Sequence, residues 1–297
     1  MGMTILTLEQ VQGDNMLDVL KRYGTEAEVT PYAVKRGTDA FKLKGKYFAA
    51  KGMEPQGELL DKACCEYWTS TKAEGSIGKA YSVGGFSVSQ EPSWNSENGI
   101  RLVVPLDEIR DKITDSYTVE GLNGPVEVVT YGEYPQSVFN VEENHKLFEL
   151  YENGVMKPTG KTYGAEGYKV ARYYDGDDRD YEQDDYNEYE YNGDRYVLAK
   201  RAVYDNGSSR YFFSKVEPIE WLVDEKSGLA ISKKCIIGGI PLKRNGVYFG
   251  NMDKTRVQKF IDNELAYDIE PKKVIKKDIE TMLEEEQVEE KPMEKSL

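Results

Sequence analysis

The chain has 297 residues, of which 39% are hydrophobic and 31% charged, enough apolar material for one large domain or two small ones. Fifty-three acidic residues against 39 basic ones give a formal net charge of −14. This excess argues against direct nucleic-acid binding and against an anionic membrane surface, because both need clustered Lys and Arg. It favours a protein partner with a basic surface.

The three cysteines are Cys64, Cys65 and Cys235. An odd number with two adjacent members does not suit a disulfide framework, so we expect reduced thiols packed as small hydrophobes. The N-terminal residues 1–8 lack the basic start and apolar length of a signal peptide, and no run of 18 apolar residues occurs. The expected location is the cytoplasm, or the virion or host cytoplasm for a phage-encoded chain.

The first part of the chain predicts short helices and strands. Asp14 is the expected cap of a short helix, and Thr30-Pro31 with Gly37 marks the start and end of another. The Gly- and Pro-containing stretch 41–57 predicts a loop or hairpin. Further expected elements are strands at 64–71 and 100–106 and a hairpin over 79–88 around Gly84-Gly85.

Residues 107–125 form a polar segment that closes with two glycines and a proline, which predicts a linker. Beyond it the expected elements are a strand at 126–131, a turn at 132–136, one or two helical turns at 141–151, strands at 196–199, 211–213, 219–223 and 229–232, and a helix at 253–266 capped by Asp253. Residues 271–297 are highly charged, which predicts a disordered tail or, alternatively, a docking helix.

Between Tyr173 and Tyr196 the chain holds ten acidic residues and seven tyrosines. Three interpretations stay open: a solvated acidic loop, a calcium loop, and a protein-binding surface in which tyrosines supply rigid contact area. The calcium pattern starting at Asp175 lacks the closing glutamate, because Tyr186 stands at its twelfth position. The residues expected to bind a partner are Trp94, Tyr173, Tyr174, Asp177, Asp178, Asp180, Tyr181, Asp184, Asp185, Tyr186 and Tyr189.

Trp94 lies among polar turn residues, where an aromatic side chain serves either recognition or loop packing. Trp68, Trp221 and Arg101 lie on apolar strands and are expected to be structural. His145 is the single histidine, which excludes a multi-histidine metal site. We find no nucleophile-elbow, zincin, P-loop or dinucleotide-binding motif. The sequence therefore predicts no catalytic residue, no metal and no cofactor.

Three motifs before residue 107 resemble the C-terminal part of a known fold. They are EYWTST at 66–71, KAYSV at 79–83 and NGIRLVV at 98–104. They are similar to the ending of the C-type-lectin-like fold of formylglycine-generating enzymes and their non-enzymatic relatives. LTLE at 6–9 and TPYA at 30–33 resemble the stretch before that ending in an uncharacterised bacterial domain of the same superfamily.

Motifs after residue 125 resemble the beginning of the same domain. They are YGEYPQ at 131–136, KVEPIEW at 215–221, ISK at 231–233 and TRVQKFIDNE at 255–264. In the last of these Phe260 and Ile261 replace the Trp-Leu pair of the family pattern.

The resemblance implies an α+β, C-type-lectin-like fold with a mainly antiparallel twisted sheet, few helices and circularly permuted halves. Residues 1–106 would be the later half, 107–125 the linker, 126–270 the earlier half with an acidic tyrosine-rich insertion at 173–196, and 271–297 a tail. The alternative is a pair of half-domains that complete each other between two chains, which leaves a homo-oligomer possible.

For function, we expect a non-enzymatic module that recognises a basic surface on a protein partner, such as an inhibitor or a phage–host interaction protein. The alternatives are an oxidase-like enzyme of the formylglycine-generating type and a calcium-dependent ligand binder. The missing clusters of metal ligands favour the binding module over both alternatives.

Overall fold

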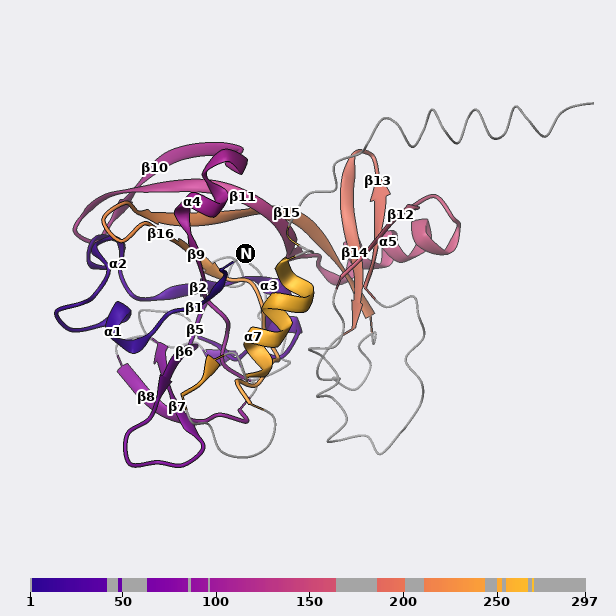
Figure 1. The fold of residues 1–297 in the computed structure, drawn as a ribbon. Helices are drawn as coiled ribbons and strands as arrows, with labels where there is room; N and C mark the ends of the chain where they lie inside the picture. The colour runs from indigo at the N-terminus through magenta and orange to yellow at the C-terminus, as the bar shows by residue number, and fades with distance from the viewer. Residues whose placement is uncertain are drawn as a thin grey trace, which may run out of the picture.

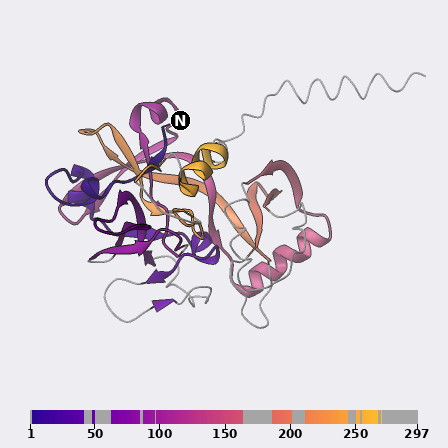
Figure 2. The same ribbon diagram turned by 60° about the horizontal axis from the view of Figure 1, so that its bottom comes forward.

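The computed structural model of the chain describes residues 2–41, 48–49, 63–84, 87–95, 97–163, 186–200, 211–243, 250–252, 255–266 and 269. Its strands form three mostly antiparallel sheets with few helices, which confirms the expected α+β class. Figures 1 and 2 show a main body and a smaller lobe, and the long strand β15 (Tyr211–Asp224) runs from one into the other.

The largest sheet of the described chain has the order β1-β9-β16-β15-β14-β13-β12, with β11 also paired to β15 and β10 paired to β11. Its other strands are β1 (Thr4–Ile5), β9 (Leu102–Pro105), β10 (Asp115–Gly121), β11 (Gly124–Val138), β12 (Lys157–Thr162), β13 (Asn187–Tyr191), β14 (Asp194–Lys200) and β16 (Leu229–Ser232). The first part of β15 pairs with β14 in the lobe, and its last part pairs with β16 in the body.

Segments from both ends of the chain meet in this sheet. Strand β9 pairs with β16 in a register that sets Val104 against Ala230. The largest apolar cluster likewise mixes the two parts, and its bulky members include Tyr32, Trp68, Leu102, Tyr131, Tyr134, Phe212 and Trp221. Trp68, Trp221 and Arg101 are fully buried, as expected for structural side chains.

The expected linker at 107–125 is wrong as a description of that segment. It contains most of helix α4 (Leu106–Ile109), the 3₁₀ turn η2 (Arg110–Lys112) and strand β10, which forms a hairpin with β11. The glycines at 121 and 124 are the facing residues of the hairpin turn. The strand was missed because its alternating side chains are mostly exposed and polar, so it lacks an apolar stripe.

The expected turn at 132–136 is also wrong, because β11 continues through it with two register shifts. Gly132 has a φ of +71°, and a Cβ there would lie 2.9 Å from the carbonyl oxygen of Ile269. At the second shift the Gln136 amide donates to the carbonyls of Glu217 and Pro218, at 2.9 and 2.8 Å. Glycine and proline therefore mark irregularities within one strand here.

Two smaller sheets complete the body. One has the order β17-β2-β5-β3-β4 and contains β17 (Lys234–Cys235), β2 (Ala27–Val29), β5 (Cys64–Cys65), β3 (Ala40–Phe41) and β4 (Phe48–Ala49). The other has the order β6-β7-β8 and contains β6 (Tyr67–Lys72), β7 (Lys79–Gly84) and β8 (Ser87–Pro92). The predicted hairpin over 79–88 is confirmed, whereas the predicted strand 64–71 divides at Glu66 between two sheets. Within 41–57, the described residues place Phe41 and Phe48 opposite each other in an antiparallel pair.

The helices of the described chain are short. They are α1 (Leu8–Val11), α2 (Asp18–Tyr23), α3 (Pro31–Lys35), α4, α5 (Val141–Glu152) and α7 (Arg256–Phe260), which continues as the π turn η5 (Ile261–Leu265). None of these helices is long and apolar enough to cross a membrane. The Thr30 hydroxyl caps α3 by accepting from the Ala33 amide at 3.2 Å, and Pro31 fills the first turn as predicted.

Other predicted caps differ from the observed ones. Helix α2 begins after Leu17 rather than at Asp14, and the hydroxyl of Thr255 caps α7. Asp253 and the tail 271–297 lie outside the described residues. Helix α5 is longer than the predicted one or two turns because Asn140 and Glu143 close a capping box at its start.

The lobe has its own small core beneath α5. Its buried members are Leu147, Met156, Tyr189, Tyr196, Leu198 and Phe213. The Phe148 and Phe213 rings lie 5.1 Å apart in an edge-on contact, as do those of Tyr151 and Tyr189. In Figure 2, α5 lies against one side of the lobe. The end of the predicted insertion at 173–196 is thus the β13–β14 hairpin.

Candidate functional site

Trp94 is 66% exposed in the turn that follows strand β8. The amide of Ser93 donates to the carbonyl of Gly78 at 2.8 Å, and that of Asn95 donates to the carbonyl of Pro92 at 2.8 Å. The backbone on both sides of the indole is therefore fixed, while the indole itself lies in solvent.

The same turn is tied to two other parts of the body. The carbonyl of Ser93 accepts from the amide of Lys243, and the carbonyl of Glu97 accepts from the amide of Asp39, both at 2.8 Å. The side chain of Asn95 accepts from the amide of Glu97 at 2.8 Å and closes the turn. A loop held by three segments presents its side chains with little loss of freedom on binding.

Exposed apolar side chains gather on the β6–β8 sheet. Ile77, in the turn between β6 and β7, is 76% exposed, and Val88 on β8 is 37% exposed. Ile77 lies next to Trp94 because the flanking residues Gly78 and Ser93 are hydrogen-bonded. We call Ile77, Trp94 and strand β8 the β8 surface. The other exposed large apolar residues of the described chain are Leu122, Val141 and Val155.

Two carboxylates give the β6–β8 sheet a negative face. Glu66 accepts a hydrogen bond from the Ser82 hydroxyl at 3.0 Å. Burial raises the pKa of Glu66 and the nearby charge of Glu91 raises it further, while the bond from Ser82 lowers it. Glu91 and Ser89 pair with Ala80 and Ser82 on β7, and so they point to the same face as Glu66. A cation near this face would relieve the repulsion between the two glutamates.

The predicted binding residues of the acidic tyrosine-rich stretch divide into two groups. Tyr173, Tyr174, Asp177, Asp178, Asp180, Tyr181, Asp184 and Asp185 lie outside the described residues. Tyr186 and Tyr189 are buried, at 4% and 7% exposure, so their assignment to a contact surface is wrong. Tyr189 lies on β13 and packs in the small core of the lobe, whereas Tyr186 precedes β13 and packs in the largest apolar cluster. The calcium pattern at 175–180 also lies outside the described residues.

The two described residues that flank this stretch lie side by side. The amide of Tyr163 donates to the carbonyl of Tyr186 at 3.0 Å, and the amide of Tyr186 donates to that of Leu198 at 2.7 Å. The ring of Tyr186 lies 5.0 Å from the guanidinium of Arg36, and the ring of Tyr163 packs edge-on against Tyr134. The two described ends of the chain on either side of this stretch therefore lie at one place, between lobe and body.

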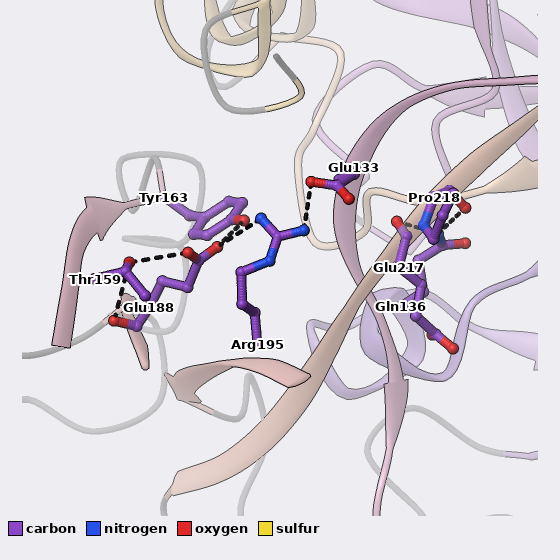
Figure 3. A network of polar contacts seen from close by, with 8 residues as sticks. All are labelled: Glu133, Gln136, Thr159, Tyr163, Glu188, Arg195, Glu217 and Pro218. Atoms are coloured by element: carbon purple, nitrogen blue, oxygen red, sulfur yellow. Dashed lines mark hydrogen bonds and ion pairs between the residues drawn. The ribbon is translucent and has the colours of Figure 1, made fainter. Parts of the chain in front are cut away.

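A polar network surrounds that place (Figure 3). The buried carboxylate of Glu188 accepts from the hydroxyl of Thr159 at 2.9 Å and from that of Tyr163 at 2.7 Å. Arg195 lies between Glu188, at 3.8 Å, and Glu133 on β11, at 2.5 Å. One guanidinium therefore bridges a lobe carboxylate to a body carboxylate. The network satisfies its charges internally, which suits a structural joint more than catalysis.

A second polar cluster lies on the body. Glu220 accepts hydrogen bonds from the hydroxyl of Tyr117 and from Lys233, the latter at 2.9 Å. Burial raises the pKa of Glu220, but these two hydrogen bonds outweigh it and leave the pKa below its usual value. Nearby, burial raises the pKa of Tyr23 to about 12, and the charge of Glu28 adds to the shift.

Arg101 is buried without a hydrogen-bonded carboxylate among the described residues. Its Nε donates to the carbonyl of Ser232 at 3.1 Å and its Nη1 to that of Thr25 at 3.0 Å. The guanidinium carbon lies 5.4 Å from the centre of the Tyr67 ring. Nη2 has no hydrogen-bond partner in the described part of the structure. Arg101 thus joins β9 to β16 and to the turn after α2.

The three cysteines are free and buried, as predicted. A Cβ on Gly99 would lie 2.6 Å from Sγ of Cys65 and 3.1 Å from Sγ of Cys235. Any side chain at position 99 would therefore clash with these sulfur atoms, and only glycine fits there. Burial raises the pKa of Cys64 to about 12, and burial with a hydrogen bond to Cys235 raises that of Cys65. Because the thiolate is the reactive form, these thiols suit packing rather than catalysis.

The described residues contain no group of three or more His, Cys, Asp or Glu side chains arranged to hold a metal ion. His145 is exposed on α5, whereas all three cysteines are buried in the body, so no Cys–His pair forms. Comparisons with protein families, curated proteins and solved structures found no match to this chain.

Sequence reasoning found Trp94 but missed the rest of the β8 surface. Ile77 and Val88 are isolated apolar residues among polar neighbours, and only the strand pairing brings them onto one sheet. The Glu188–Arg195–Glu133 network was hidden for the same reason, because Glu133 lies 62 positions from Arg195. The one available signal was the alternation of apolar and polar residues in 79–92.

Proposed function

We propose that this chain is a non-enzymatic module that binds a protein partner carrying a basic surface. The observation that carries the proposal is Trp94, which is 66% exposed on a turn whose backbone is fixed on both sides. Exposed tryptophans on fixed backbones are typical anchors of protein interfaces, because they bury a large apolar area at small entropic cost. Ile77 adds an exposed apolar side chain next to this anchor, and Val88 adds another toward the opposite end of strand β8.

Charge supports a basic partner. The chain carries a formal charge of −14, and Glu66 and Glu91 place two carboxylates on one face of the β6–β8 sheet. The acidic stretch around Asp177 and Asp184 is part of the proposed contact. Opposite charge would speed association and make it weaken with salt. An inhibitor or a phage–host interaction protein fits this description.

The proposal includes the fold suggested by the motifs, a circularly permuted C-type-lectin-like domain. Its support is that motifs from both parts of the chain meet: strand β9, which directly follows Arg101, lies beside the hairpin containing Trp221 and Ile231. Such a framework would hold a recognition loop on a rigid sheet. The three free thiols of the described chain suit a reducing compartment, so we place the protein in a cytoplasm.

The oxidase-like alternative has less support. Burial disfavours the thiolates that such chemistry requires, and the described cysteines show no accessible thiol. The calcium-dependent alternative depends on residues outside the described ranges. The binding module depends on a described, exposed side chain instead.

Affinity capture from the source cells tests the proposed function. Wild type is compared with Trp94→Ala, with a variant in which Asp177, Asp178, Asp180, Asp184 and Asp185 become Asn, and with Leu122→Ala. Leu122 is 79% exposed in the β10–β11 turn and serves as the matched control. We expect the same partner to be lost at least tenfold with the first two variants and with high salt, but not with Leu122→Ala. Equal capture by all four proteins at both salt concentrations would refute the proposal.

A further inference from the structure

Strand β8 differs from the other long edge strands of the described chain. It is six residues long, closes the β6–β7–β8 sheet on one side, and has a single charged residue, Glu91. Strand β12 carries Lys157, Pro158 and Gly160 and has a break in its register. Strand β10 carries Asp115 and Glu120. Lysine, proline, charge and irregular register are the usual protections of an exposed edge; β8 has Glu91 and Pro92 at its C-terminal end and none of these features from Ser87 to Gln90.

The side chains of β8 are partly or fully exposed along its whole length. Its pairing with β7 is regular from Ser87 to Pro92, without a bulge. One side of its backbone is bonded to β7, and the described chain places no strand on its other side. From Ser87 to Glu91 such an edge offers backbone donors and acceptors to an added strand, whereas Pro92 has no amide hydrogen and its carbonyl accepts from the amide of Asn95.

We infer that β8 binds an extended, basic segment of the partner as an additional strand of this sheet. The inference rests on the proposed function and specifies how the same surface would bind. Backbone hydrogen bonds would supply much of the affinity, and side chains on alternating faces would supply specificity.

The two faces of β8 determine the pattern of the added segment. Ser89 and Glu91 point to the face that also holds Glu66, whereas Val88 and Gln90 point to the opposite face. An added strand has the same alternation. A segment with Lys or Arg at every second position would set its cations near Glu91 and its apolar residues near Val88. At the C-terminal end of β8, Trp94 and Ile77 would pack against an apolar side chain of the added segment.

A partner segment fits this edge better than a second copy of the chain. Two copies would each carry a net charge of −14, and pairing of two β8 strands would place the Glu91 side chains of both copies on adjacent strands. Like charges repel in that arrangement, whereas a cationic segment compensates them.

The test uses synthetic peptides with the full-length protein. The probes are a short peptide of alternating Lys and Val, the matched peptide of alternating Glu and Val, and the Lys–Val peptide with every amide N-methylated. Binding is read by hydrogen exchange of residues 87–92 and by the fluorescence of Trp94, since Trp68 and Trp221 are fully buried. We expect the Lys–Val peptide alone to bind, with at least tenfold slower exchange across β8.

Two variants separate the edge from the rest of the surface. Val88→Lys should weaken binding of the Lys–Val peptide at least tenfold, because it adds a like charge to the edge. Val155→Lys, on the lobe and 44% exposed, is the matched control and should bind as wild type does. Urea unfolding of both variants establishes that they are folded.

Equal binding of the N-methylated peptide, equal binding of the Glu–Val peptide, or unchanged exchange at 87–92 would each overturn strand addition. Slower exchange at 87–92 that grows with protein concentration, without peptide, would overturn it in favour of a second copy. Partner capture that needs Trp94 but tolerates Val88→Lys would contradict strand addition and leave the proposed function intact. Capture that ignores Trp94 would contradict the proposed function itself.

Discussion

Trp221 and Trp94 are the same residue type in opposite surroundings. The indole of Trp221 is buried, donates to the carbonyl of Tyr131 at 2.9 Å and packs against the Tyr131 ring. Trp94 lies in solvent at the end of β8, although its backbone is fixed. The fold explains why the first position needs tryptophan and gives no reason for the second. This contrast directs attention to binding at the β8 surface.

The largest expected effect on stability is on the body core. Trp221→Ala should lower the free energy of unfolding by about 3–5 kcal/mol, because it removes a large buried ring and its hydrogen bond to the Tyr131 carbonyl. Trp94→Ala should change it by less than about 0.5 kcal/mol. Urea unfolding followed by circular dichroism measures both. Similar losses for the two variants would remove the contrast between core and surface.

Arg101 tests how the two parts of the chain are joined. Arg101→Lys should cost about 2–4 kcal/mol, because one ammonium cannot replace a fork that bonds the carbonyls of Ser232 and Thr25. The control is Arg110→Lys, whose exposed pair with Glu225 at 3.1 Å should be worth less than about 1 kcal/mol. The comparison is made by urea unfolding, and equal shifts for both variants would contradict the assigned role of Arg101.

Mutations in the polar network between lobe and body should lower the free energy of unfolding less than the changes at Trp221 and Arg101. Glu188→Gln keeps the shape of the side chain but weakens two hydrogen bonds and an ion pair, which should cost about 1–2 kcal/mol. Glu142→Gln, which breaks an exposed pair with Lys146, should cost less than about 0.5 kcal/mol. Chemical unfolding monitored by tyrosine fluorescence measures the difference. A Glu188→Gln protein as stable as wild type would show that the network carries no stability.

Alkaline pH should affect the body through its buried phenols. Burial raises the pKa of Tyr67 to about 12 from its usual value near 10. Its stabilising contribution is therefore complete below pH 10 and declines as pH rises from 10 to 12, by about 1 kcal/mol at pH 11. Urea midpoints between pH 8 and 11.5 should fall in that window, and less so in Tyr67→Phe. A midpoint that does not change with pH would contradict this burial.

The class of fold can be predicted from the sequence, and so can the role of side chains that depends only on neighbouring residues in the chain. The capped start of α3, the hairpin over 79–88 and the buried tryptophans depend on residues near each other in the chain. Strand β10 was missed because an exposed polar strand leaves no apolar periodicity. The turn expected around Gly132 is a bulge, because its glycine accommodates Ile269 from the far end of the chain.

The candidate site was less accessible to sequence reasoning. Trp94 stood out because an aromatic residue among turn residues is unusual, but its apolar neighbours were assembled by strand pairing. Composition alone assigns Tyr186 and Tyr189 to a surface, whereas the fold buries Tyr186 in the largest apolar cluster and Tyr189 in the core of the lobe. Composition describes a stretch as a whole and does not decide which side of a strand a residue occupies.

Hydrogen exchange on the complex with the captured partner tests the central claim most directly. The account predicts slower exchange across residues 87–95 when the partner binds, with little change in the β10–β11 turn around Leu122. The effect should be lost with Trp94→Ala at equal protein concentrations. Partner binding that leaves 87–95 unprotected while protecting another face would contradict recognition through the β8 surface.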